Sequence, residues 1–146
     1  MRPDRPPLTR DDLVKAMADE EIEILFQPQV ARASGRVVAA EALARWQHGK
    51  FGELSAETLF AVASRTDCLA ALSAHVQQRA IAAAAAWPEP LSELSLSVNI
   101  IAADTVRPDF ADRVLGMVEA SGFDRPRLAL EVTDTELIEN LDVAAQ

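Results

Sequence analysis

The sequence has little of several residue types on which common functions depend. Cys68 is the only cysteine in 146 residues, which excludes an internal disulfide and a cysteine-based zinc cluster. No apolar run free of charges approaches the roughly 18 residues that a membrane-spanning helix needs. Residues 1–10 hold charges and prolines where a secretory signal would be apolar. We therefore expect a cytoplasmic protein without direct membrane insertion, which leaves open a membrane-anchored sensor domain upstream.

Basic residues are also scarce. The chain has 14 lysines and arginines against 23 aspartates and glutamates, a net charge of -9. Binding to a DNA or RNA polymer depends on many Lys and Arg contacts to phosphates, so we expect no such partner. A small anionic ligand would need local help from a metal ion or a well-placed arginine.

The length and the 49% hydrophobic content fit one domain with its own core. Residues 1–8 contain three of the eight prolines and no periodicity, and we predict a flexible N-terminal arm there. The remaining residues, 9–146, are predicted to form one unit.

Hydrophobic periodicity predicts the element order α-β-β-αα-β-α-β-α. Strands are expected at residues 21–30, 36–46, 94–100 and 127–133, and helices at residues 9–18, 55–64, 69–86, 109–121 and from 133 onward. The short connection between the first two strands predicts an antiparallel hairpin. Strands that follow helices indicate a parallel sheet, so an open four-stranded sheet and the first half of a β/α barrel both fit this α/β pattern.

Each predicted strand has one apolar face and one face with a polar residue near its end. In the second strand Glu41, Leu43 and Arg45 share a face, because side chains alternate along a strand, and alanines point the other way. In a β/α barrel the inner faces converge at the C-terminal rim. The corresponding polar residues of the other three strands are Gln27, Asn99 and Glu131.

Two carboxylates and an amide oxygen form a hard, all-oxygen set suited to Mg²⁺ or Mn²⁺. Arg45, on the face of Glu41, could hold a phosphate through paired N–H donors. The alternative interpretation is the solvated face of a half-exposed sheet. Composition and periodicity leave both interpretations open.

The segment Glu41-Ala42-Leu43-Ala44-Arg45-Trp46 resembles the signature of the EAL family of cyclic-di-GMP phosphodiesterases. A three-letter match alone is a weak signal in an alanine-rich sequence, but four ordered motifs are specific. The three further segments that resemble family strands are residues 26–30 (FQPQV), 97–100 (SVNI) and 130–133 (LEVT).

The resemblance implies a TIM-like β/α barrel with an antiparallel first strand, truncated here to about its first four strands. It also implies hydrolysis of cyclic di-GMP to pGpG by a water activated at two divalent metals, with Glu41 as a catalytic residue. By the resemblance, the metal ligands for Mg²⁺ or Mn²⁺ would be Glu41, Asn99 and Glu131, and the residues that bind the dinucleotide would be Gln27, Leu43 and Arg45.

The resemblance also implies a lysine and an aspartate pair after the last of these motifs. The two lysines present are Lys15 and Lys50, and the Asp11-Asp12 pair belongs to the first helix cap. We therefore expect this chain to be an inactive fragment of a phosphodiesterase domain. The alternative is a catalytically silent EAL module that senses cyclic di-GMP or binds a protein. The unpaired strand edges of half a barrel predict a homodimer or a domain-swapped assembly.

Overall fold

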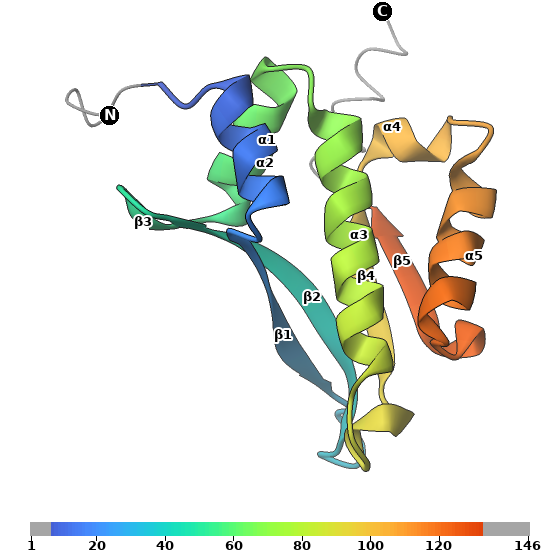
Figure 1. The fold of residues 1–146 in the computed structure, drawn as a ribbon. Coiled ribbons are helices and arrows are strands. Elements are labelled where there is room, and N and C mark those ends of the chain that lie inside the picture. Colours follow the sequence, from blue (N-terminus) through green and yellow to red (C-terminus); the bar gives the residue numbers. More distant parts are fainter. Residues whose placement is uncertain (1–6, 133–146) are drawn as a thin grey trace, which may run out of the picture.

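A computed structural model describes residues 7–132, which form a mixed sheet with helices packed on it (Figure 1). The strands are β1 (Ile22–Val30), β2 (Val37–His48), β3 (Gly52–Leu54), β4 (Ser95–Ile100) and β5 (Leu128–Val132). The helices are α1 (Arg10–Ala18), α2 (Ala56–Arg65), α3 (Leu69–Ala85), α4 (Ala102–Thr105) and α5 (Phe110–Ser121), with 3-10 turns η1 (Leu91–Glu93) and η2 (Arg125–Arg127). The predicted order is confirmed as far as β5, and the helix predicted from residue 133 lies outside the described residues.

Local capping interactions explain where two of the helices begin. At the start of α1 the Thr9 hydroxyl accepts the Asp12 N–H at 3.2 Å, and the Asp12 carboxylate accepts the Thr9 N–H at 2.8 Å. At the start of α2 the Ser55 hydroxyl accepts the Thr58 N–H at 3.2 Å. Each contact satisfies backbone N–H groups that have no partner inside the helix.

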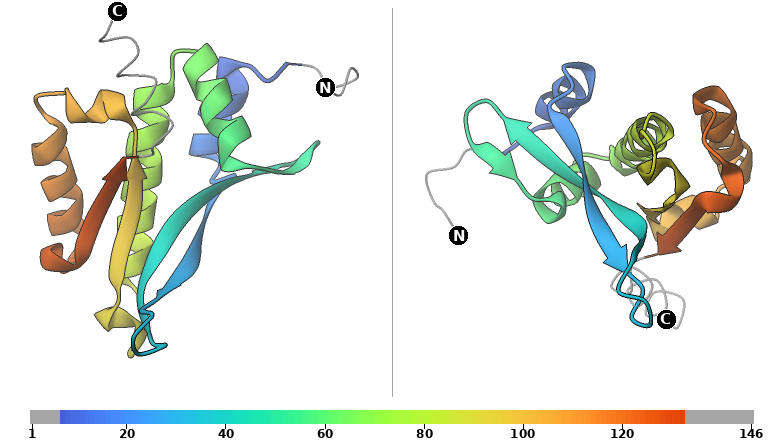
Figure 2. Two further views of the ribbon diagram at one scale, coloured as in Figure 1. Left: turned by 180° about the vertical axis from the view of Figure 1, so that it is seen from behind. Right: turned by 90° about the horizontal axis from the view of Figure 1, so that it is seen from below.

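The strands lie in the order β1-β2-β4-β5, and the short β3 pairs with β2. β1 runs antiparallel to β2, whereas β2, β4 and β5 are parallel to one another. The upper part of β2 bends away from β4 toward β3, so the hairpin of β1 and β2 leaves the plane of the other strands (Figure 2). The predicted hairpin followed by parallel strands is therefore confirmed.

The core lies between the helices and one face of the sheet. Ala42 is buried in a cluster with Ala80 and Ala84 of α3, and their small side chains let the helix approach the sheet closely. Trp46, which has no exposed surface, anchors a second cluster that includes Leu13 of α1. The alternation predicted for β2 is confirmed, because its alanines are buried while the intervening residues are half-buried.

Three features differ from the sequence expectations. The sequence analysis did not predict β3, a three-residue strand that forms a tight antiparallel hairpin with the end of β2, or the four-residue helix α4. Leu8, placed in the N-terminal arm by its proline-rich context, is buried in the core at 6% exposure. Its carbonyl accepts a hydrogen bond from Arg65 Nη2 at 2.8 Å. Packed structure thus begins before Thr9.

Candidate metal and phosphate site

The face of the sheet opposite the helices brings together the polar residues that the strand pattern singled out. Gln27 of β1 is paired in register with Glu41 of β2, and Glu41 is paired with Ser97 of β4. One step farther toward the C-terminal ends of the parallel strands, Asn99 of β4 is paired with Glu131 of β5. Residues paired in register on one face have neighbouring side chains. The site therefore draws on four strands.

Glu41 and Asn99 are in direct contact. Asn99 Nδ2 donates a hydrogen bond to Glu41 Oε1 at 3.1 Å, and both residues are half-buried. Neighbouring ligands in an octahedral Mg²⁺ site, with bonds of 2.0 to 2.1 Å, lie about 3 Å apart. A flip of the amide would put Oδ1 where Nδ2 stands, because the two ends have nearly the same shape. The geometry of this pair fits two ligands of one cation.

Glu131 adds a second carboxylate on the neighbouring strand. Its side chain is exposed, and its register partner is Asn99. Within residues 7–132 no three His, Cys, Asp or Glu side chains form a group that could hold a metal. The described residues thus offer a cation two carboxylates and one amide, and Mg²⁺ commonly fills its other positions with water and substrate phosphate oxygens.

Leu43 and Arg45 continue along the face of Glu41 toward the C-terminal end of β2. Leu43 is half-buried and is paired in register with Leu25, which gives this part of the face an apolar surface. Arg45 lies four residues beyond Glu41, about 13 Å along the strand. Its Nη1 donates to the Ala44 carbonyl at 2.8 Å, which engages one of the five N–H donors of the guanidinium.

A buried polar cluster lies behind the C-terminal end of β4, and we did not predict it from the sequence. It joins α3, α4 and α5 through four side chains: Ser73, Gln77, Asp104 and Arg113. The only sequence feature that hinted at the cluster was the pair Ser73 and Gln77, four positions apart beside the apolar stripe of α3. Their partner is 27 and 31 residues away in the sequence, so the pattern of the helix alone did not identify the cluster.

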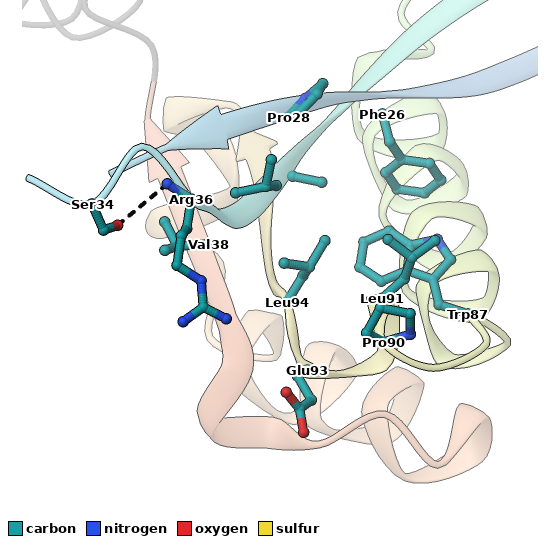
Figure 3. Close-up of a pocket in the computed structure, with 12 residues that line it drawn as sticks. Phe26, Pro28, Ser34, Arg36, Val38, Trp87, Pro90, Leu91, Glu93 and Leu94 are labelled. Carbon is teal, nitrogen blue, oxygen red and sulfur yellow. Dashed lines mark hydrogen bonds between the residues drawn. The ribbon is translucent and has the colours of Figure 1, made fainter. Parts of the chain in front are cut away.

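A separate cavity of about 870 Å³ opens at the other end of the sheet (Figure 3). It lies between the tip of the β1–β2 hairpin and the connection from α3 to β4. Phe26 and Trp87 meet in it edge to face, with ring centroids 5.0 Å apart. Phe26 and Pro28 alternate with Gln27 along β1, so the cavity is on the helix side of the strands. None of the six predicted site residues lines it.

The fold defines the class of the domain: an α/β unit built as the opening strands of a β/α barrel, with the first strand reversed. A family model described as "EAL domain" matches residues 10–146. The chain therefore belongs to the EAL domain family.

Two curated relatives come from Pseudomonas aeruginosa. "Cyclic di-GMP phosphodiesterase PA2567" is 30% identical over 127 residues, which cover 86% of this chain and 22% of that protein. "Cyclic di-GMP phosphodiesterase NbdA" is 31% identical over 133 residues, which cover 90% of this chain and 17% of that protein. The chain thus spans about a fifth of the length of either relative.

Solved structures confirm the predicted fold class. The PaMucR phosphodiesterase, solved as a c-di-GMP complex, matches with a TM-score of 0.79 at 22% identity, over 91% of this chain and 54% of that chain. Klebsiella pneumoniae BlrP1, solved as a manganese/cy-diGMP complex, matches with a TM-score of 0.65 at 26% identity, over 84% of this chain and 30% of that chain. The chain corresponds to about half of an EAL barrel. No helix within residues 7–132 combines the length and the apolar character needed to cross a membrane.

Proposed function

We propose that this chain supplies the metal-binding and phosphate-binding side of a cyclic-di-GMP phosphodiesterase site. The observation that carries the proposal is the 3.1 Å contact between Asn99 Nδ2 and Glu41 Oε1, with Glu131 paired to Asn99 on the next strand. The names of the two Pseudomonas relatives support the substrate class. The manganese complex of BlrP1 supports a divalent cation.

In this proposal some residues on the face of the sheet opposite the helices bind the cation, and others bind the dinucleotide. Glu41 and Glu131 contribute negative charge to the cation, and Asn99 contributes a neutral oxygen. A divalent ion bound there would offset charge on the phosphate and would acidify a coordinated water. Gln27, beside Glu41 in register, hydrogen-bonds the dinucleotide.

Leu43 and Arg45 hold the rest of the dinucleotide. Leu43, together with Leu25, presents an apolar surface to it. Arg45 turns from the Ala44 carbonyl to a phosphate, where two parallel N–H donors give a strong and directional contact.

The test is a calorimetric titration of cyclic di-GMP into the chain, with and without Mg²⁺ or Mn²⁺. We expect metal-dependent binding that Glu41→Ala weakens by at least about tenfold, the scale seen when support of a metal site is removed. Glu119→Ala is the matched control, because it removes an exposed glutamate from α5, a helix that packs against α3 on the helix side of the sheet. Equal binding by the wild type and Glu41→Ala would refute the proposal.

A second candidate function is a catalytically silent EAL module that binds cyclic di-GMP as a sensor. The observation that favours it is that no three His, Cys, Asp or Glu side chains within residues 7–132 form a group that could hold a metal, whereas Glu41 and Asn99 still present polar groups on the face of the sheet. Chromatography of the reaction mixture tests the silent sensor against the enzyme. Metal-dependent pGpG above the level of Glu41→Ala would exclude the silent sensor, whereas binding without pGpG is expected both of the sensor and of the inactive fragment predicted from the sequence.

A further inference from the structure

The buried cluster behind β4 is centred on a single carboxylate oxygen. Asp104 has no exposed surface. Its Oδ2 accepts hydrogen bonds from Ser73 Oγ at 2.7 Å, from Gln77 Nε2 at 3.1 Å and from the Ile101 N–H at 3.3 Å. Gln77 Nε2 also donates to Ser73 Oγ at 2.9 Å. One atom thus joins the middle of α3 to the turn that follows β4.

Arg113 of α5 supplies the positive charge that a buried carboxylate requires. Its Nη2 lies 3.6 Å from Asp104 Oδ1, and its side chain is 23% exposed. The contact is an ion pair without a hydrogen bond, because neither Asp104 Oδ1 nor Arg113 Nη2 has a hydrogen-bond partner. The second carboxylate oxygen therefore links the same turn electrostatically to α5.

Stability alone gives little reason to place a charge here. Burying an ion pair costs several kcal/mol of desolvation per ion, and well-packed apolar residues of similar volume are often as stable or more so. What a carboxylate does provide is directional bonding to three donors at one point. This points to a role in fixing geometry rather than in adding net stability.

The turn that Asp104 holds is directly connected to Asn99. Ile101 follows Asn99 by two residues, about 7 Å of extended chain. Ile101 is the N-cap of α4, but its apolar side chain cannot accept a hydrogen bond from the first turn. The side-chain contribution to the cap comes instead from the Asp104 carboxylate, which accepts the Ile101 N–H. A helix of four residues is too short to fix its own start. Besides its pairing with β5, the end of β4 is thus tied to α3 through the bonds of Asp104.

We propose that Asp104 is a positioning residue for the metal site: through the Ile101 N–H, Ser73 and Gln77 it holds the end of β4 so that the Asn99 amide meets Glu41. The metal-binding part of this inference rests on the proposed function. Displacing a site group by about 1 Å can reduce its effect about a hundredfold, so a small shift of β4 would suffice to weaken the site.

The experiment compares three variants of the full chain. Asp104→Asn keeps the shape of the side chain but removes its charge, and Ser73→Ala deletes a single donor and is the milder change. Val76→Ala is the matched control. Val76 is buried on α3 next to Gln77 in the sequence, but it packs in the core cluster of Trp46 and not with Asp104. Thermal unfolding shows that each variant is folded and how far it is destabilised.

Two measurements then separate positioning from general loss of stability. The first is the NMR signal of the Asn99 side-chain NH₂, assigned by its disappearance in Asn99→Ser. The second is the Mn²⁺ affinity. We expect Asp104→Asn and Ser73→Ala to shift the Asn99 signal, and Asp104→Asn to weaken Mn²⁺ binding by about 10- to 100-fold. Val76→Ala should leave both measurements at the wild-type values.

Other outcomes bear separately on the positioning role of Asp104 and on the proposed metal site. An Asn99 signal unchanged in both network variants, or shifted equally in Val76→Ala, overturns the positioning role. If Asp104→Asn does not fold, the signal in Ser73→Ala decides. If the wild type binds no Mn²⁺, the proposed function fails, and the Asn99 signal still tests whether Asp104 positions β4.

Discussion

Replacing Asn99 by aspartate would put a second negative charge against Glu41. The wild-type amide donates a hydrogen bond to Glu41 Oε1 at 3.1 Å, which an ionised aspartate cannot do. Two unit charges about 4 Å apart repel by about 4 kcal/mol at an effective dielectric constant of about 20. Because both side chains are only half-buried, solvent reduces this repulsion. We expect Asn99→Asp to lower the free energy of unfolding by about 1 to 2 kcal/mol at pH 7.

This loss should depend on pH and on metal in defined directions. Two adjacent carboxylates bind one shared proton more tightly than separate ones do, so the folded variant would bind more protons than its unfolded chain. The free energy of unfolding of Asn99→Asp, relative to wild type, should therefore rise as the pH falls from 7 toward 5. Mn²⁺ should also offset the loss, since an ion at 100 times its Kd adds about 2.7 kcal/mol.

Urea unfolding at pH 5 and pH 7, with and without Mn²⁺, measures all of these effects. Gln78→Glu is the control, because it adds the same charge at an exposed position on α3. Wild-type stability of Asn99→Asp at pH 7 without metal would refute the reasoning, since it would mean that the two side chains are not neighbours in solution. Equal pH dependence in Gln78→Glu would refute it as well.

Two further predictions concern stability. Burial, together with the nearby positive charge of Arg79, lowers the pKa of His75 below 6.5, despite the opposing charge of Glu20. The unfolded chain then binds a proton that the folded chain resists, so the free energy of unfolding should fall as the pH drops below about 6.5. His75→Gln should reduce that slope in urea unfolding, and an unchanged slope would contradict the assignment. Trp46→Ala, which empties a site with no exposed surface, should lower the free energy of unfolding by about 3 to 5 kcal/mol. Calorimetry should show the lower Tm, and a loss below about 1 kcal/mol would mean that the core collapses around the gap.

Local rules predicted much of the fold because several elements follow from short-range interactions. Thr9 and Asp12 cap each other within one turn of α1, so the sequence alone indicated where that helix begins. The alternation of Glu41 with alanines predicted which face of β2 the helices cover. β3 could not be predicted in this way, because three residues carry no period and the strand exists only by pairing with β2.

The sequence predicted which strand faces carry the site residues, but it did not predict which of these residues contact one another. Periodicity placed Glu41 and Asn99 on polar faces of separate strands, and family motifs suggested that they meet. Their contact depends on the register of β2 against β4, which is set by helices packed behind both strands. Asp104 escaped prediction for the same reason, since its partners come from a helix about 30 residues away.

The reversed direction of β1 determines where the polypeptide enters the barrel. β2, β4 and β5 end at the rim that carries Asn99 and Glu131, whereas β1 starts there, with Ile22 paired to Trp46 near the end of β2. Helix α1 therefore joins the sheet from the side of the candidate site (Figure 1). In a barrel whose strands are all parallel, the first strand would start at the opposite end. Any domain fused ahead of α1 would thus be attached at the end of the sheet that carries the candidate site, where a movement of α1 against Trp46 could alter the site directly.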